Sequence, residues 1–218
     1  MVQTQLRDRG IGDERVLEAM SSIPREHFLD GGRQDRAYAD EAVPIDAGQT
    51  ISQPWVVARM TELLAPQPGE RVLELGTGSG YQAAILAALG ATVTSIERHD
   101  RLAAKARERI AALDLPGSVT LRTADGSLGD PAGAPWDGVI VTAAAPRIPT
   151  ELRDQLADGG RLVIPVGPRD HQLLTLVVRH GNDWRDTSHG AVVFVPLIGP
   201  GGFPDDGGTF RGERRRWF

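Results

Sequence analysis

The chain of 218 residues contains no cysteine. This absence excludes a disulfide-stabilised scaffold, a zinc or iron–sulfur site held by thiolates, and a cysteine nucleophile. The sequence also lacks any run near the roughly 18 apolar residues that a membrane-spanning helix needs. Its first ten residues, MVQTQLRDRG, have no apolar core of the secretory-signal type. We therefore expect a cytoplasmic protein with no membrane partner.

Positive charge is also in short supply, because 24 lysines and arginines stand against 29 aspartates and glutamates, a net charge of −5. Nucleic acids bind basic surfaces, so we expect no nucleic-acid partner. No two histidines are three or four residues apart, so the sequence offers no helical metal-binding pair and no metal is expected. The five histidines are His27, His99, His171, His180 and His189.

The order of apolar and polar residues predicts one domain over residues 1–200. Residues 1–50 are mixed and polar, with a short helix predicted at GDERVLEAM and capped by Asp13. Residues 52–167 alternate between strands (RVLEL, ATVTSIE, SVTLRTA, WDGVIVTAA, RLVIPVG) and helices (PWVVARMTELLA, YQAAILAALG, RLAAKARERIAALDL, PTELRDQLADGG). This alternation predicts an α/β fold with a Rossmann-like, doubly wound and mostly parallel sheet.

In the last part of the domain, residues 168–200, the alternation of strands and helices ends. QLLTLVVRHGNDW and HGAVVFVPLIG are predicted as two strands joined by a polar turn, which would form an antiparallel pair at one edge of the sheet. Residues 201–218 are rich in glycine and charge, so we expect a flexible tail. Its basic cluster, Arg214 to Arg216, is interpreted as a solvated terminus, with an acidic partner as the alternative.

A glycine-rich turn follows the first strand of the alternating region, in VLELGTGSGYQAA. Gly76, Gly78 and Gly80 bring bare backbone and free helix amides to one place, which suits a bound ligand, although a simple turn is the alternative. The spacing is not the G-x-G-x-x-G of dinucleotide folds. With Glu74 two residues before the first glycine, it resembles motif I of class I methyltransferases. That resemblance implies S-adenosyl-L-methionine as cofactor and S-adenosyl-L-homocysteine as product.

Two acidic residues follow the next strands. Glu97 ends the second strand, where a carboxylate can accept hydrogen bonds from ribose hydroxyls; the alternative is a solvated residue that starts a helix. Asp125 follows the third strand and can accept from an adenine amino group, with Gly126 permitting close approach; the alternative is a turn. The carboxyl ends of parallel strands meet at one edge, so these residues are predicted to share one ligand site.

A more specific resemblance lies just before the glycine turn, in VPIDAGQTISQPWVVARMTELL. Together with GSGYQAA, GGRLVIPVG and VVFVPLIG, this segment is similar to the protein-L-isoaspartate O-methyltransferase family over about residues 1–198. The resemblance implies a seven-stranded methyltransferase sheet with an antiparallel edge, an N-terminal helical extension over residues 1–50, and an exchanged order of the last two strands. It also implies methyl transfer to the free α-carboxylate of L-isoaspartyl residues in damaged proteins and peptides. Repair then proceeds through a succinimide.

The resemblance implies roles for particular residues. Ser52 falls on the family's active-site serine, which would orient the substrate carboxylate; from the sequence alone it is equally a helix cap. Val193, Val195 and Pro196 fall on the substrate-contacting segment, for which a buried core strand is the alternative. The expected cofactor residues are Gln49, Thr50, Ile51, Glu74, Gly76, Thr77, Gly78, Gly80, Glu97, Asp125 and Gly126.

The sequence shows no evident His–Asp dyad or carboxylate pair. The implied chemistry is consistent with this, because a carboxylate is already ionised near pH 7 and needs no general base. The expected partners are isoaspartyl-containing proteins and peptides, and a monomer is expected. The nearest alternative is a related methyltransferase that modifies aspartate in a ribosomally made peptide. A NAD-dependent oxidoreductase is opposed by the glycine spacing, and a non-catalytic cofactor-binding protein is opposed by the intact Ser52 segment.

Overall fold

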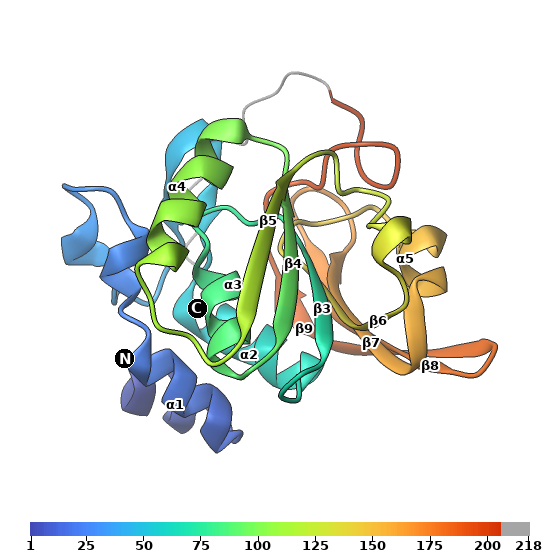
Figure 1. Cartoon of the computed structure of the whole chain (residues 1–218), viewed down its shortest axis with the longest axis horizontal. Helices are drawn as coiled ribbons and strands as arrows, with labels where there is room; N and C mark the ends of the chain where they lie inside the picture. The colour runs from blue at the N-terminus through green and yellow to red at the C-terminus, as the bar shows by residue number, and fades with distance from the viewer. Residues whose placement is uncertain (206–218) are drawn as a thin grey trace.

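The computed structural model describes residues 1–205. The predicted basic cluster, Arg214 to Arg216, lies outside the described residues. A seven-stranded sheet runs through the molecule in the order β5-β4-β3-β6-β7-β8-β9 (Figure 1). Its strands are β3 (Arg71–Leu75), β4 (Thr92–Glu97), β5 (Ser118–Thr123), β6 (Trp136–Val141), β7 (Leu156–Val166), β8 (Gln172–His180) and β9 (Asp183–Val192).

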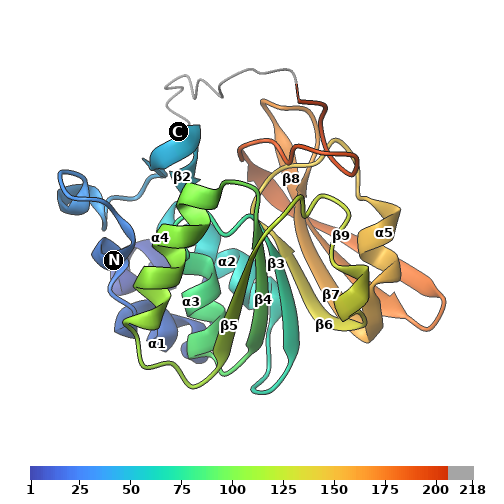
Figure 2. The same ribbon diagram turned by 45° about the horizontal axis from the view of Figure 1, so that its top comes forward.

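The first five strands of that order are parallel, whereas β8 runs antiparallel to both of its neighbours. The predicted mostly parallel sheet with an antiparallel edge is therefore confirmed. The last three strands follow one another in chain order across the sheet, which matches the exchanged order that the family resemblance implies (Figure 2). The chain turns outward in opposite directions from the adjacent strands β3 and β6, and ligands bind at such a switch point in open α/β sheets.

Helices cover both faces of the sheet. On one face lie α2, α3 and α4, with α1 outside them, and α5 lies on the other (Figure 1). Helix α3 is buried along nearly its whole length, which explains its apolar sequence YQAAILAA. Helix α4 instead buries only one stripe, which includes Leu102, Ala106 and Ile110. The bounds are α1 (Glu14–Ser22), α2 (Pro54–Leu64), α3 (Tyr81–Ala88), α4 (Asp100–Ala111) and α5 (Thr150–Asp154).

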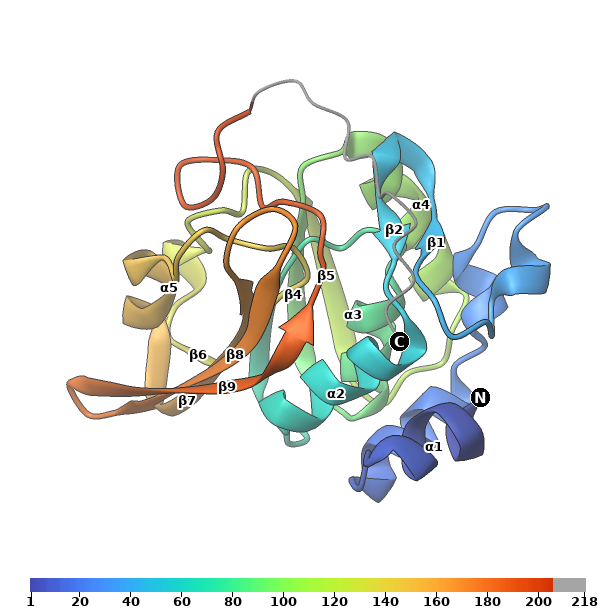
Figure 3. The same cartoon turned by 180° about the vertical axis from the view of Figure 1, so that it is seen from behind.

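The N-terminal extension packs beside this helical layer (Figure 3). Its helix α1 begins as the sequence predicts, because the Asp13 carboxylate accepts a hydrogen bond from the Arg15 backbone amide at 2.9 Å. The remaining pieces are short: the helical turns η1 (Val2–Leu6), η2 (Arg7–Arg9), η3 (Arg25–Phe28), η4 (Gln34–Arg36) and η5 (Asp46–Gly48), and the paired strands β1 (Val43–Pro44) and β2 (Thr50–Ile51). A sixth turn, η6 (Pro131–Gly133), precedes β6. Within residues 1–205, no helix is long and apolar enough to span a bilayer.

The predicted helix over residues 149–160 is wrong in its second half. Helix α5 ends at Asp154, and residues 156–160 already belong to β7. Gly159 has a positive φ of 76°, which is not helical, and a Cβ at Gly160 would lie 2.9 Å from the Trp136 carbonyl oxygen. The glycine pair therefore lets the chain fold closely onto β6.

The predicted second edge strand was placed too late in the sequence. Strand β9 begins at Asp183, directly after a tight turn at Gly181, and it ends at Val192. Its polar residues are accommodated because an edge strand is exposed. Val193, Val195 and Pro196 consequently lie beyond the strand, in a segment that returns toward the centre of the sheet.

The beginning of the expected tail also packs onto the domain. The Phe203 amide donates to the Leu197 carbonyl at 2.7 Å, the Gly201 amide donates to the Ser127 hydroxyl at 3.3 Å, and the Arg169 guanidinium lies over the Phe203 ring. Residues 201–205 thus differ from the flexible segment that their composition suggested.

Candidate functional site

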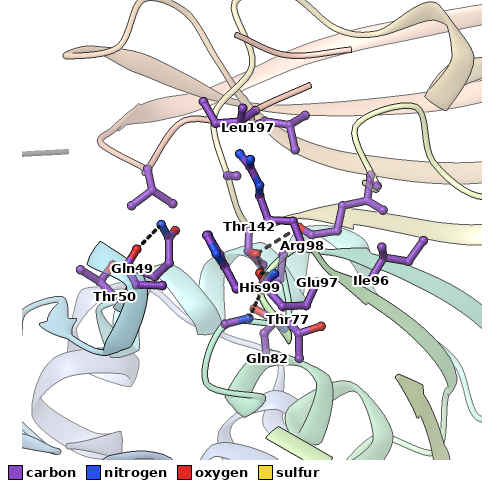
Figure 4. Close-up of a pocket in the computed structure, with 18 of the residues that line it drawn as sticks. Gln49, Thr50, Thr77, Gln82, Ile96, Glu97, Arg98, His99, Thr142 and Leu197 are labelled. Carbon is purple, nitrogen blue, oxygen red and sulfur yellow. Dashed lines mark hydrogen bonds between the residues drawn. The ribbon is translucent and has the colours of Figure 1, made fainter. Parts of the chain in front are cut away.

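A cleft of about 320 Å³ lies at the carboxyl ends of the central strands. In Figure 4, Gln49 and Thr50 lie on one side of it, Glu97 and Ile96 on the other, and Leu197 lies across from them. The sheet therefore brings segments that are far apart in the sequence to one place. Its walls include residues 47–52, 75–79, 96–99, 125–127, 142–143 and 195–198.

The glycine turn forms the floor of this cleft between β3 and α3. Gly76 has φ +96°, and a Cβ at that position would lie 2.5 Å from the Thr142 hydroxyl oxygen. That hydroxyl itself donates to the Gly76 carbonyl at 2.5 Å. Gly78 has φ +53° and also lines the cleft. Both positions therefore need glycine for backbone conformation, and Gly76 needs it for space as well.

The Glu97 carboxylate lies on the wall of the cleft that faces Gln49 and Thr50. Its Oε2 accepts from the Gly78 amide and its Oε1 accepts from the His99 amide, each at 2.9 Å. The side chain is buried but lines the cleft. The carboxylate consequently holds the glycine turn against the start of α4. Its oxygens have further lone pairs that can accept ligand hydroxyls.

Asp125 and Gly126 lie at the next strand end, also on the cleft wall. The Asp125 carboxylate accepts from the Ser127 amide at 2.8 Å, which is the turn role considered from the sequence. A Cβ on Gly126 would lie 3.0–3.1 Å from Leu75 and Ile96 side chains, so glycine lets this loop approach the floor closely. The geometry accommodates both the turn role and a ligand role.

Glu74 is placed beneath the cleft and is not among the residues that line it. It is fully buried, the Ser95 hydroxyl donates to its Oε2, and its Oε1 has no hydrogen-bond partner. Burial raises the pKa of this carboxyl to about 8, with a smaller contribution from the charge of Glu97. Thr77, which does line the cleft, shares a 2.5 Å hydrogen bond with Ser95. Glu74 therefore contacts the site through two hydroxyls.

The Ser52 segment forms the side of the cleft opposite Glu97. Strand β2 pairs with β1, which fixes Thr50 and Ile51, and Ser52 follows directly. Ser52 is not the cap of α2, because the N-cap position is Gln53 and no side chain caps that helix. The helix begins with Pro54, which needs no partner for an amide hydrogen. The capping role that the sequence left open for Ser52 is thus absent.

The predicted substrate segment divides between cleft and surface. Val195 and Pro196 line the cleft, held there because the Ala144 amide donates to the Val195 carbonyl at 2.8 Å and the Leu197 amide donates to the Ala144 carbonyl at 2.7 Å. Val193 lies outside the cleft and is half exposed. Gly80, likewise, faces α4 and not the cleft, with a Cβ position 3.1 Å from Ala106.

Several lining residues were not predicted. Thr142 follows strand β6, so its position at a carboxyl strand end was a usable signal. Arg98 and Asp205 form an ion pair at 2.9 Å, and both line the cleft. Asp205 comes from the glycine-rich segment and gave no sequence signal. Across residues 1–205, no group of histidine and acidic side chains has the arrangement of a metal site.

Comparison with known proteins places this arrangement among methyltransferases. A family model for protein-L-isoaspartate(D-aspartate) O-methyltransferase (PCMT) matches residues 1–201. The protein-L-isoaspartate O-methyltransferase of Methanoregula boonei is 51% identical over 203 residues, which cover 93% of each chain. A solved protein-L-isoaspartate O-methyltransferase superposes with a TM-score of 0.78 at 26% identity, over 92% of this chain and 67% of that one.

A Plasmodium falciparum protein described as PCMT was solved in complex with S-adenosyl-L-homocysteine. It superposes with a TM-score of 0.76 at 25% identity, over 90% of this chain and 96% of that one. The similarity therefore extends along nearly the whole chain in both sequence and fold.

Proposed function

The chain belongs to the protein-L-isoaspartate(D-aspartate) O-methyltransferase family, and from that premise we propose how its cleft works. As a member, it transfers a methyl group from S-adenosyl-L-methionine to the free α-carboxylate of L-isoaspartyl residues in proteins and peptides. The observation that carries this proposal is the junction of two segments. The Ser52 segment and the glycine turn, which are about 25 residues apart in the sequence, line the same cleft.

The cleft fits the cofactor in three respects. The glycine turn presents backbone where a Cβ would clash. Glu97 presents a carboxylate suited to ribose hydroxyls, and Asp125 lies at the adjoining strand end for an adenine amino group. Gln49, Thr50, Ile51, Thr77, Gly78 and Gly126 complete this wall in the proposal. Glu74 supports the turn from below, and Gly80 allows α3 to pack on α4.

The bound cofactor supplies a methyl group on a cationic sulfur. The protein's own task is to bind and align the attacking carboxylate, which is ionised near pH 7 without a general base. Alignment of two reactants can contribute roughly 7–11 kcal/mol toward lowering a barrier. The Ser52 hydroxyl makes no hydrogen bond within residues 1–205, where the hydrogen bond that Ser52 receives from the Arg25 side chain goes to its carbonyl oxygen. The hydroxyl is therefore free to donate to one carboxylate oxygen and to direct the other toward the methyl group.

The substrate enters in this proposal past the return segment after β9. Val195 and Pro196 form an apolar wall that contacts the peptide, and the half-exposed Val193 extends it at the surface. Residues 1–50 cover the cleft, 52–167 hold the cofactor, and 168–200 form the peptide side. Because one chain supplies all of these walls, we expect the enzyme to act as a monomer, and on the sequence grounds given above we expect it to act in the cytoplasm.

The test offers labelled S-adenosyl-L-methionine with two synthetic peptides that differ only in isoaspartate versus aspartate at one position. Label is expected on the isoaspartyl peptide alone, as a base-labile ester. Label on the aspartyl peptide alone would instead favour the aspartate-modifying relative. Label on neither peptide, with S-adenosyl-L-homocysteine bound by the protein, contradicts the proposed substrate.

A further inference from the structure

Arg25 is a fully buried guanidinium with no carboxylate partner. Its side chain lies directly behind the Ser52 segment, in the turn η3. None of the ion pairs in residues 1–205 includes it, and its Nη1 has no hydrogen-bond partner. Buried charges in proteins are normally paired, because removing an ion from water is costly. An unpaired one therefore calls for a functional explanation.

The contacts that Arg25 does make connect the N-terminal extension, residues 1–50, with the Ser52 segment of the cleft. Its Nε donates to the Ala37 carbonyl and its Nη2 donates to the Ser52 carbonyl, both at 2.7 Å. The guanidinium carbon lies 5.0 Å from the centre of the Tyr81 ring. Ser52 and Tyr81 both line the cleft. The planar guanidinium thus holds the Ser52 segment close to Tyr81, the first residue of α3.

The guanidinium of Arg25 stays protonated near neutral pH. Burial lowers the pKa of Arg25 to about 10, which still leaves it protonated. Its ionisable neighbours are the phenols of Tyr38 and Tyr81, and burial raises the pKa of both, so both stay neutral. Glu26, the nearest acidic residue along the chain, is engaged by the Tyr38 hydroxyl. Within residues 1–205, neither Glu26 nor any other carboxylate forms an ion pair with the guanidinium behind Ser52.

We propose that Arg25 is a positioning and selectivity residue that acts through Ser52: it holds the Ser52 backbone in place, and its buried charge favours a substrate with an ionised α-carboxylate over a neutral one. This rests on the proposed function, because the ligand is the isoaspartyl carboxylate. In a part-buried site a unit charge acts over several ångströms with little screening. A neutral α-carboxamide in the same place gains nothing from it.

The test compares the wild-type protein with Arg25→Met and Arg25→Lys. For each, KM and kcat are measured with an isoaspartyl peptide, and the inhibition constant is measured for the same peptide with its α-carboxylate replaced by a carboxamide. In the wild type we expect the acid to bind more tightly than the amide. In Arg25→Met this preference should fall by roughly tenfold, the size expected for a lost unit charge in such a site.

Arg25→Lys separates the two parts of the role. Lysine keeps the charge but cannot hold both carbonyls with one planar group, so the preference for the acid should persist while kcat falls. Arg161→Met is the matched control. Arg161 is a largely buried guanidinium that donates to a carbonyl, that of Ala65 at 3.0 Å, but unlike Arg25 it pairs with a carboxylate, that of Glu70, and it lies at the opposite ends of the strands. Its loss should affect thermal stability and leave the acid-to-amide ratio unchanged.

The affinity for S-adenosyl-L-homocysteine, measured by calorimetry, shows whether each variant is folded. If Arg25→Met binds this product normally and loses affinity for acid and amide equally, or changes neither, the selectivity role is wrong. If Arg25→Met does not fold, Arg25→Lys decides: an acid-to-amide ratio that collapses despite the retained charge contradicts the proposal. A wild-type protein that methylates no isoaspartyl peptide refutes the proposed function instead, so the two failures are distinguishable.

Discussion

Replacing Glu74 with glutamine should change how the stability of this protein depends on pH. The carboxyl is fully buried beneath the glycine turn with one oxygen unpartnered, and burial raises its pKa from about 4.5 to about 8. The folded state therefore keeps a proton that the unfolded chain releases as pH rises through about 4.5. This group's contribution to stability is full below that pH and is lost as pH rises toward 8.

The magnitude follows from proton linkage. Each pH unit between the two pKa values costs about 1.4 kcal/mol of unfolding free energy. Between pH 5 and pH 7 the wild type should thus lose about 3 kcal/mol through this group, and Glu74→Gln, which is neutral throughout, should not. Urea unfolding at pH 5, 6 and 7 measures the difference between the two proteins, in which the contributions of other groups cancel.

The control for this experiment is Glu108→Gln, on the exposed face of α4. The free-energy difference between wild type and Glu74→Gln should shift steadily in favour of the variant as pH rises. The difference between wild type and Glu108→Gln should stay flat. Parallel pH profiles for wild type and Glu74→Gln would refute the reasoning that this carboxyl is protonated in the folded protein.

Three further predictions concern the cleft. Ser52→Ala should bind S-adenosyl-L-homocysteine normally by calorimetry but transfer methyl at least about tenfold more slowly in single-turnover assays, since one hydrogen bond to a charged group is lost; an unchanged rate contradicts its role. Gly76→Ala places a Cβ 2.5 Å from the Thr142 hydroxyl at φ +96°, so its affinity for that product should fall at least about tenfold. Lys105 bridges Asp30 and Asp46 at 2.8 and 2.7 Å, so Lys105→Met should speed amide exchange in residues 46–50, and unchanged exchange would show that the loop is held otherwise.

Much of the fold was predictable because it depends on local sequence patterns. The alternation of strands and helices, the Asp13 cap and the glycine turn each depend on residues close together in the sequence. The errors arose where tertiary contacts determine whether a segment forms a helix or a strand. The Gly159–Gly160 pair lets a predicted helix become strand against β6, and a polar run forms the exposed edge strand β9.

The site followed the same division. Glu97 and Asp125 were predicted from their places at strand ends, and the structure brings them to one cleft with Gln49 and Thr50. The position of Glu74 below the floor was not predictable. Glu74 belongs to a strand whose successive side chains point to opposite faces, whereas the floor of the cleft is built by the turn that follows this strand. Arg25 gave no signal, since its partners are backbone carbonyls of distant residues.

A crystal structure with both S-adenosyl-L-homocysteine and an isoaspartyl peptide tests the central claim most directly. The account predicts the product along the glycine turn with its ribose at Glu97, and the peptide α-carboxylate within hydrogen-bond distance of the Ser52 hydroxyl with one oxygen facing the sulfur. A peptide bound elsewhere, or a carboxylate turned away from both Ser52 and the sulfur, would contradict it.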